Sequence, residues 1–196
     1  MNWRSIGLIL IALGFYVLPW LINPGVGLTS NAYDLAEWAS LHPEVRNQSP
    51  SLLTSLLLRL PLVIFALMVA LHIGITPKKH LAGIGLFLLL AVASLPPLEF
   101  LTVARNDPNY QQQFVLFLGA LILGGVAISG LFNRWYWIEI LTLGFVGIGA
   151  SIWGLMQARH LMIGFSMPVA VGLGSVGTCL MFLIISVEAY SKRGNS

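Results

Sequence analysis

Long apolar runs alternate with polar connections along this chain, and charged residues fall almost only in the connections. A helix needs about 20 mostly apolar residues to cross the hydrocarbon of a bilayer. The pattern predicts an all-α, polytopic membrane protein with six transmembrane helices in a single transmembrane domain, 1–196. The six predicted spans are residues 6–22, 52–75, 81–98, 114–132, 137–156 and 163–187.

The connection at residues 23–51 carries a helical pattern of its own. Ser30 is expected to cap a helix over residues 31–42 that Pro43 ends. Asp34 and Glu37 fall on its polar side. The apolar side holds Ala32, Leu35, Ala36, Trp38, Ala39 and His42. We expect a short amphipathic helix, which either lies on the outer membrane surface or acts as a lid or docking platform over a cavity that opens outward.

Composition agrees with membrane embedding. Hydrophobic residues make up 57% of the chain and charged residues 9%, whereas a soluble domain carries about a quarter charged residues. The N-terminus resembles a signal peptide. However, the run at residues 6–22 is long and lacks a small-residue cleavage site, so we expect it to remain as the first span.

The charges of the connections predict the orientation. One set of connections holds six Lys and Arg residues: Arg4, Lys78, Lys79, Arg134, Lys192 and Arg193. The other set holds three: Arg46, Arg105 and Arg159. Because Lys and Arg accumulate on the cytoplasmic side, we expect both termini to be cytoplasmic. An even number of spans agrees with this orientation.

Several kinds of chemistry have no support in the sequence. The basic residues form no run longer than two, so nucleic acid is not an expected partner in spite of a pI near 9.3. Cys179 is the single cysteine and has no intramolecular disulfide partner. Because no metal-ligand spacing, phosphate loop or catalytic motif occurs, we expect no metal and no cofactor, and the enzyme class is disfavoured.

Arg59 is the residue that the pattern singles out, because it lies within the apolar run 52–75. In one interpretation the span starts near Leu60, Pro61 lies in its first turn, and Arg59 reaches lipid phosphates. In the other, Arg59 is buried and paired. Glu99 is then the expected partner, with Asp34 or Glu37 as alternatives if the surface helix folds over.

Aromatic and small residues predict how the helices are placed. Trp20, Trp135 and Trp137 are expected at the membrane interfaces. Small residues recur at a spacing of four, a pattern that lets helix backbones approach closely. We expect this pattern to serve packing within the chain or docking of a partner subunit. The pairs include Ala120 with Gly124, Gly147 with Ser151, Ala150 with Gly154, and Gly174 with Thr178.

These features leave three functional hypotheses. The favoured one is an integral membrane subunit of a transport or substrate-capture system, with a site that faces outward. The alternative is a structural or accessory subunit of a larger membrane complex. A membrane enzyme that acts on lipid through His42 and His160 is less favoured. The expected partners are the lipid bilayer and other membrane subunits, and the candidate ligand-binding residues are Arg59, Glu99, Asp34, Glu37 and Trp38.

Overall fold

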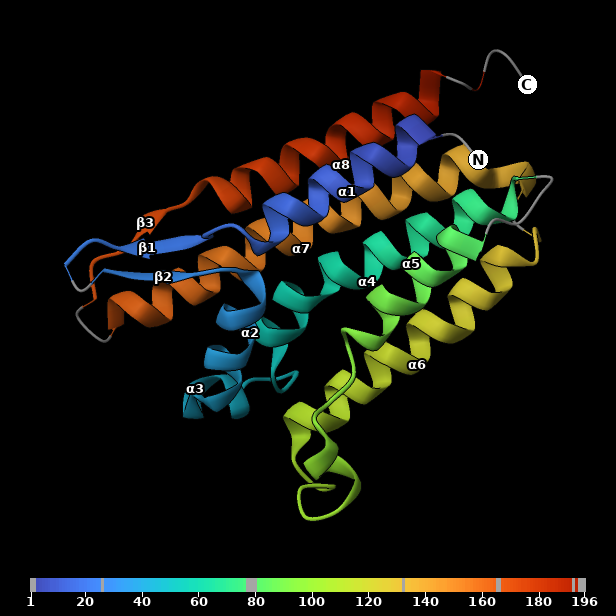
Figure 1. Cartoon of the computed structure of the whole chain (residues 1–196). Coiled ribbons are helices and arrows are strands. Elements are labelled where there is room, and N and C mark those ends of the chain that lie inside the picture. Colours follow the sequence, from blue (N-terminus) through green and yellow to red (C-terminus); the bar gives the residue numbers. More distant parts are fainter. Residues whose placement is uncertain are drawn as a thin grey trace.

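The computed structural model describes residues 3–25, 27–76, 81–131, 133–164, 167–191 and 193. Within these ranges the protein is helical apart from one small sheet (Figure 1). The helices are α1 Trp3–Val17, α2 Ala32–Leu41, α3 Pro43–Arg46, α4 Leu53–Gly74, α5 Leu81–Val92, α6 Pro108–Ile128, α7 Tyr136–Gly164 and α8 Leu173–Ser191. Short 3-10 turns are η1 Leu98–Leu101 and η2 Asn133–Trp135, and the strands are β1 Leu21–Asn23, β2 Leu28–Ser30 and β3 Ala170–Val171.

Helix α4 forms the centre of the bundle. It packs against α7, α6, α5 and α2, while α8 packs against α7 and α1. A helix that is apolar on all sides is stable only when other elements surround it. Among the long helices α4 fits that description, because 78% of its most apolar window is buried within the protein.

Among the described residues, four helices are long and apolar enough to cross a membrane. They are α4, α6, α7 together with η2, and α8. Helices α1 and α5 are apolar but shorter, with 15 and 12 residues. The structure therefore agrees with a helical membrane protein.

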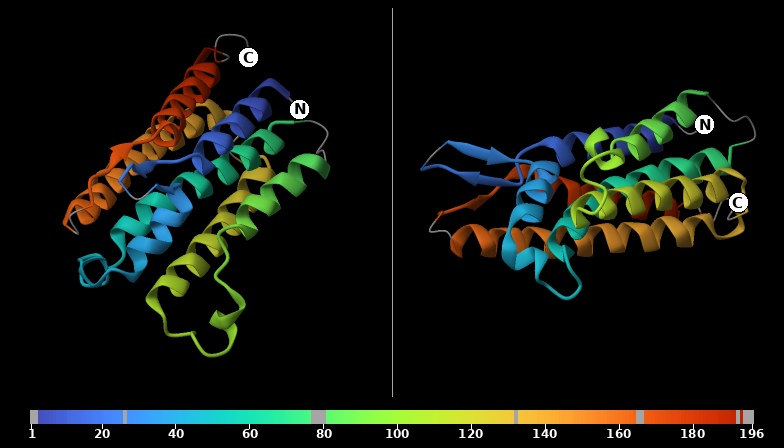
Figure 2. Two further views of the ribbon diagram at one scale, coloured as in Figure 1. Left: turned by 60° about the vertical axis from the view of Figure 1, so that its left-hand side comes forward. Right: turned by 90° about the horizontal axis from the view of Figure 1, so that it is seen from below.

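The two ends of the bundle differ in what they carry. The start of α1 and the end of α8 lie at one end, together with the end of α6 and the start of α7 (Figure 1). The sheet, α2 and α3 lie at the opposite end, which we call the α2 end (Figures 1 and 2). Helix α2 lies within the expected range 31–42 and is one residue shorter at each end. Asn31 rather than Ser30 caps it: the Asn31 side chain accepts a hydrogen bond from the backbone N–H of Asp34 at 3.0 Å.

The structure shifts several predicted boundaries. Helix α6 begins at Pro108 rather than at 114, because the Asp107 side chain caps it and proline suits the first helical position. Helix α7 continues to Gly164 instead of ending at 156. Helix α8 begins at Leu173 rather than at 163, and part of the chain between the two helices is the strand β3.

The sheet and the burial of Trp20 were not expected from the sequence. Strand β1 pairs antiparallel with β2 on one side, with Ile22 opposite Thr29, and with β3 on the other. Trp20 lies directly before β1, is fully buried, and meets the Tyr16 ring edge-on at 6.0 Å between centroids. The prediction that Trp20 anchors at a lipid interface is therefore wrong, because strand pairing turns the chain back over this side chain.

Small residues allow close helix contacts within the chain. A Cβ atom added at Gly147 would lie 2.6 Å from the Phe182 ring, and one at Gly154 would lie 3.1 Å from Leu57. Phe182 in turn stacks on Phe65 at 4.5 Å between centroids. These small residues of α7 thus serve packing against α8 and α4, the intramolecular alternative of the sequence analysis.

Candidate functional site

Arg59 lies in the second turn of α4, near the α2 end, and only 4% of its side chain is exposed. Helix α4 begins at Leu53, so Pro61 lies in the helix interior rather than in its first turn. The boundary assumed by the interfacial interpretation is therefore wrong. Proline supplies no N–H to the preceding turn, and close by the hydroxyl of Tyr16 donates a hydrogen bond to the carbonyl of Leu58 at 3.1 Å.

Glu37 of α2 is the partner of Arg59. The Arg59 Nη2 atom lies 2.8 Å from Glu37 Oε1. The same carboxylate accepts hydrogen bonds from Gln113 Nε2 at 2.8 Å and from Asn109 Nδ2 at 3.3 Å. Two side chains of α6 therefore share the acceptor that neutralises the Arg59 charge. The buried alternative for Arg59, with Glu37 of the surface helix as the partner, describes the structure.

Gln112 completes a cluster of five side chains. Its Oε1 accepts a hydrogen bond from Arg59 Nη1 at 3.1 Å, and its Nε2 donates to the carbonyl of Leu52 at 3.1 Å. Leu52 precedes α4 with a left-handed φ of 58°, a conformation that the surrounding contacts must hold. We call these five residues the Arg59 cluster: Glu37, Arg59, Asn109, Gln112 and Gln113.

The electrostatics of the cluster are nearly balanced. One carboxylate faces one guanidinium, and three amide side chains supply the remaining hydrogen bonds. Arg59 Nε and Asn109 Oδ1 are buried without a hydrogen-bond partner among the described residues. Tyr33 lies on α2 beside the cluster, where burial raises its pKa and the negative charge of Glu37 raises it further.

A second ion pair fastens the same elements at the surface. Arg46 of α3 lies 3.1 Å from Asp107, the residue that caps α6. Its Nε donates to the carbonyl of Ser40 at 2.7 Å. The pair is partly exposed, and such pairs contribute less than about 1 kcal/mol. The Arg59 cluster, which is more buried, is the stronger link between α2, α4 and α6.

The other predicted site residues lie outside the cluster. Glu99 is exposed in η1 and forms no side-chain ion pair among the described residues, so its predicted pairing with Arg59 is wrong. Asp34 is exposed and bonds Asn31 at 2.8 Å. Trp38 is half-buried and meets the His42 ring at 6.0 Å. Whether any of these residues binds a ligand stays a prediction.

Three members of the cluster were not expected from the sequence. Asn109, Gln112 and Gln113 fall in the predicted connection between the spans 81–98 and 114–132, whereas they lie in the first turns of α6. Their positions differ by three and four, the spacing that places helical residues on one face. That spacing, directly after the Asp-Pro helix start at 107–108, was the signal that could have identified them.

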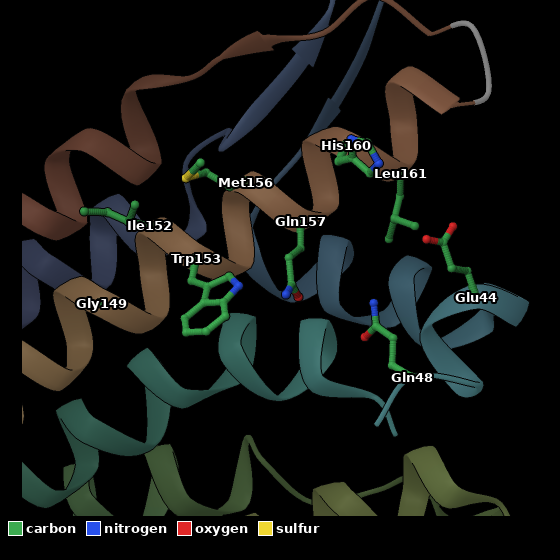
Figure 3. A pocket seen from close by; sticks show the side chains of 9 residues that line it. All are labelled: Glu44, Gln48, Gly149, Ile152, Trp153, Met156, Gln157, His160 and Leu161. Atoms are coloured by element: carbon green, nitrogen blue, oxygen red, sulfur yellow. The ribbon is translucent and has the colours of Figure 1, made fainter. Parts of the chain in front are cut away.

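Beside α2 and α3, a groove follows the surface of α7 (Figure 3). We call it the α7 groove, and its volume is about 590 Å³. At one end it is polar, with Glu44, Gln48, Gln157 and His160. Toward the middle of α7 it is apolar, with Gly149, Ile152, Trp153 and Met156.

The α7 groove is tied to the bundle through Thr54. The Thr54 hydroxyl donates to Gln157 Oε1 at 2.7 Å and lies 3.5 Å from Gln48 Oε1. Among the described residues no acceptor bonds the amide nitrogen of either glutamine, and Figure 3 shows both amides directed into the space between α7 and α3. The groove is thus lined by two amide groups with N–H donors, from Gln48 and Gln157, and by one carboxylate, from Glu44.

Histidines do not assemble a metal site in the described part of the chain. No group of three or more His, Cys, Asp or Glu side chains that could hold an ion occurs there. His42 and His160 line a small hollow next to the α7 groove. His72 is buried near the opposite end, 3.0 Å from the hydroxyl of Tyr136. His80 lies outside the described residues.

Comparison with known proteins gives no relative. The chain matches no protein-family model, no curated protein and no solved structure.

Proposed function

We propose that this protein is an integral membrane subunit of a transport or substrate-capture system whose ligand binds at the α2 end, on the outer side of the membrane. One observation carries the proposal: the α7 groove lies between the last turns of α7 and the segment of α3 and Gln48, and polar side chains from both line it (Figure 3). A few convergent polar groups above an apolar wall are typical of small-molecule sites.

The Arg59 cluster supports this assignment by fixing the walls of the groove. Glu37 lies on α2, and α3 with Glu44 follows directly, so the ion pair to Arg59 holds both helices against α4. Because Glu37 compensates the charge of Arg59 inside the protein, the cluster serves to position the site. Glu44 is then the carboxylate that is available to bind a ligand. Glu44 is exposed and forms no side-chain ion pair among the described residues.

The alternative of a purely structural subunit has less support than the sequence suggested. Its main argument was the small-residue pattern of the second half. Gly147, Gly154 and Gly174 are buried against Phe182, Leu57 and Trp20 of this same chain. Those faces are therefore occupied and are not open to a partner.

We expect the transport assignment to be testable from the proteins that co-purify with this chain. Purified from its native membrane in a mild detergent, the full chain should form a stoichiometric complex, which native mass spectrometry would count. A subunit that hydrolyses nucleotides or forms a channel should be present, because the chain itself carries no ATPase motif. A homogeneous monomer, or a complex that lacks any translocating subunit, would contradict the assignment.

Six crossings with both termini in the cytoplasm form part of the proposal. The start of α1 and the end of α8 lie at the same end of the bundle, which agrees with an even number of crossings (Figure 1). Helix α1 packs along α8, and α5 packs along α4 and α6. At about 1.5 Å per residue both are shorter than ~30 Å of hydrocarbon, so the residues that flank them would complete each crossing.

Thiol labelling tests this orientation. A cysteine at Asn47 or Asn106, both exposed at the α2 end, should react with an impermeant reagent added outside, whereas one at Lys79 should be protected. Asn109 is a poor labelling position because it is buried and bonds Glu37. Replacing Cys179 first removes the background thiol. The reverse pattern of labelling would place the groove in the cytoplasm.

A further inference from the structure

The position of the α7 groove along its helix indicates what kind of molecule fits it. Trp137, near the start of α7, and Trp153, in the groove, lie roughly 24 Å apart along the helix axis. Tryptophan prefers the interface between hydrocarbon and headgroups, so the two rings are spaced like a pair of interface anchors. The apolar part of the groove, at Gly149 and Ile152, then lies at acyl-chain depth.

The polar part of the groove lies one to two turns farther along α7. Gln157 and His160 follow Trp153 toward the α2 end, and Glu44 and Gln48 face them from the neighbouring segment (Figure 3). These groups therefore lie at headgroup depth, directly above the apolar wall. An occupant has to be amphiphilic and oriented as a lipid of that leaflet.

The charges of the polar part select the headgroup. Glu44 is the acidic side chain that lines the groove, and a carboxylate accepts strong hydrogen bonds from a cationic N–H donor. The amide nitrogens of Gln48 and Gln157 are donors that suit phosphate oxygens. A primary ammonium and a phosphate within one headgroup match both features at once.

We propose that the α7 groove binds a phospholipid whose headgroup carries a primary amine. The ammonium group meets Glu44, the phosphate accepts hydrogen bonds from Gln48 and Gln157, and an acyl chain lies along Ile152 and Gly149. This inference rests on the proposed function and names the substrate class of its site, a lipid that enters from the outer leaflet.

Lipid titration of the isolated full chain tests the proposal. After removal of bound lipid in mild detergent, native mass spectrometry should show saturable binding of phosphatidylethanolamine that is about tenfold tighter than binding of phosphatidylcholine. The two lipids share phosphate, chains and net charge, but the methylated headgroup has no N–H to donate to Glu44. About tenfold is what one charge-assisted hydrogen bond at a partly exposed position supports.

Two variants with matched controls locate the site. Glu44→Gln should remove the preference between the two lipids, whereas Glu99→Gln, another exposed carboxylate that does not line the groove, should retain it. Gly149→Phe should block the acyl part and abolish saturable binding. Gly119→Phe on α6 is its control, since a Cβ atom at either glycine meets nothing within 4 Å.

Each outcome decides one of the two proposals. Equal binding of both lipids, or a preference that survives Glu44→Gln, would mean ordinary annular lipid only and would overturn the inference, even if a translocating partner is found. Selective binding by a chain that has no translocating partner would retain the lipid site and contradict the transport assignment alone.

Discussion

Replacing Glu37 with leucine is expected to lower the free energy of unfolding by about 3 kcal/mol, because it leaves the buried Arg59 charge without a counter-charge. Arg59 has 4% of its side chain exposed, so water cannot replace the lost carboxylate. Asn109 and Gln113 also lose the acceptor that they share. The measurement is reversible unfolding of the purified protein in mixed detergent micelles.

The reciprocal change should be milder. Arg59→Leu leaves a carboxylate whose side chain is 36% exposed and which still accepts hydrogen bonds from two amides of α6. The double variant of Glu37 and Arg59 to leucine should therefore be less destabilised than the sum of the singles, by about 1 kcal/mol or more. Additive losses would show that the two groups do not interact in the folded protein.

Glu99→Leu is the matched control for the acidic partner. Glu99 is exposed and is not part of the Arg59 cluster, so its replacement should change stability by less than about 0.5 kcal/mol. A larger loss at Glu99 than at Glu37 would restore the pairing that the sequence alone favoured and would contradict the cluster described here.

The second large effect is expected at Gly174, in the first turn of α8. A Cβ atom added there would overlap the carbonyl oxygen of Leu18 and approach the Trp20 ring to 2.7 Å. The carbonyl is backbone and Trp20 is fully buried, so neither can move cheaply. Gly174→Ala should cost about 2–3 kcal/mol, the upper part of the usual range for overpacking a core.

The control for Gly174 is Gly119 of α6, where an added Cβ atom meets nothing within 4 Å. Gly119→Ala should be neutral or stabilising by up to about 1 kcal/mol, since alanine is the better helix former. Thermal unfolding of the two variants in the same detergent compares them directly. Equal midpoints would show that the segment of Leu18 and Trp20 does not approach α8 as closely as the structure has it.

Apolar run length determined the helical class and the rough position of every long helix, because burying backbone in lipid requires internal hydrogen bonds. The helix over 32–41 was also predictable, since its apolar positions recur on one side and a capping side chain precedes it. Both signals are local in the sequence. They do not depend on which other segment lies opposite.

Local sequence was a poor guide to where helices end. Polar residues at 108–113 and beyond 156 indicated loops, yet both stretches are helical. Helix ends at membrane interfaces can carry polar side chains, because these find partners on neighbouring elements. Asn109 and Gln113 donate hydrogen bonds to Glu37, and Gln157 accepts one from Thr54.

The choice of ion-pair partner was decided only by the tertiary structure. The sequence predicted that Arg59 lies at a similar membrane depth to Glu99, Asp34 and Glu37. An ion pair needs its charged atoms within about 4 Å, and a shared depth does not determine that distance. Packing of α2 against α4 brought Glu37 to 2.8 Å and left Glu99 exposed. The α7 groove likewise exists only because α3, far away in sequence, comes to lie beside α7.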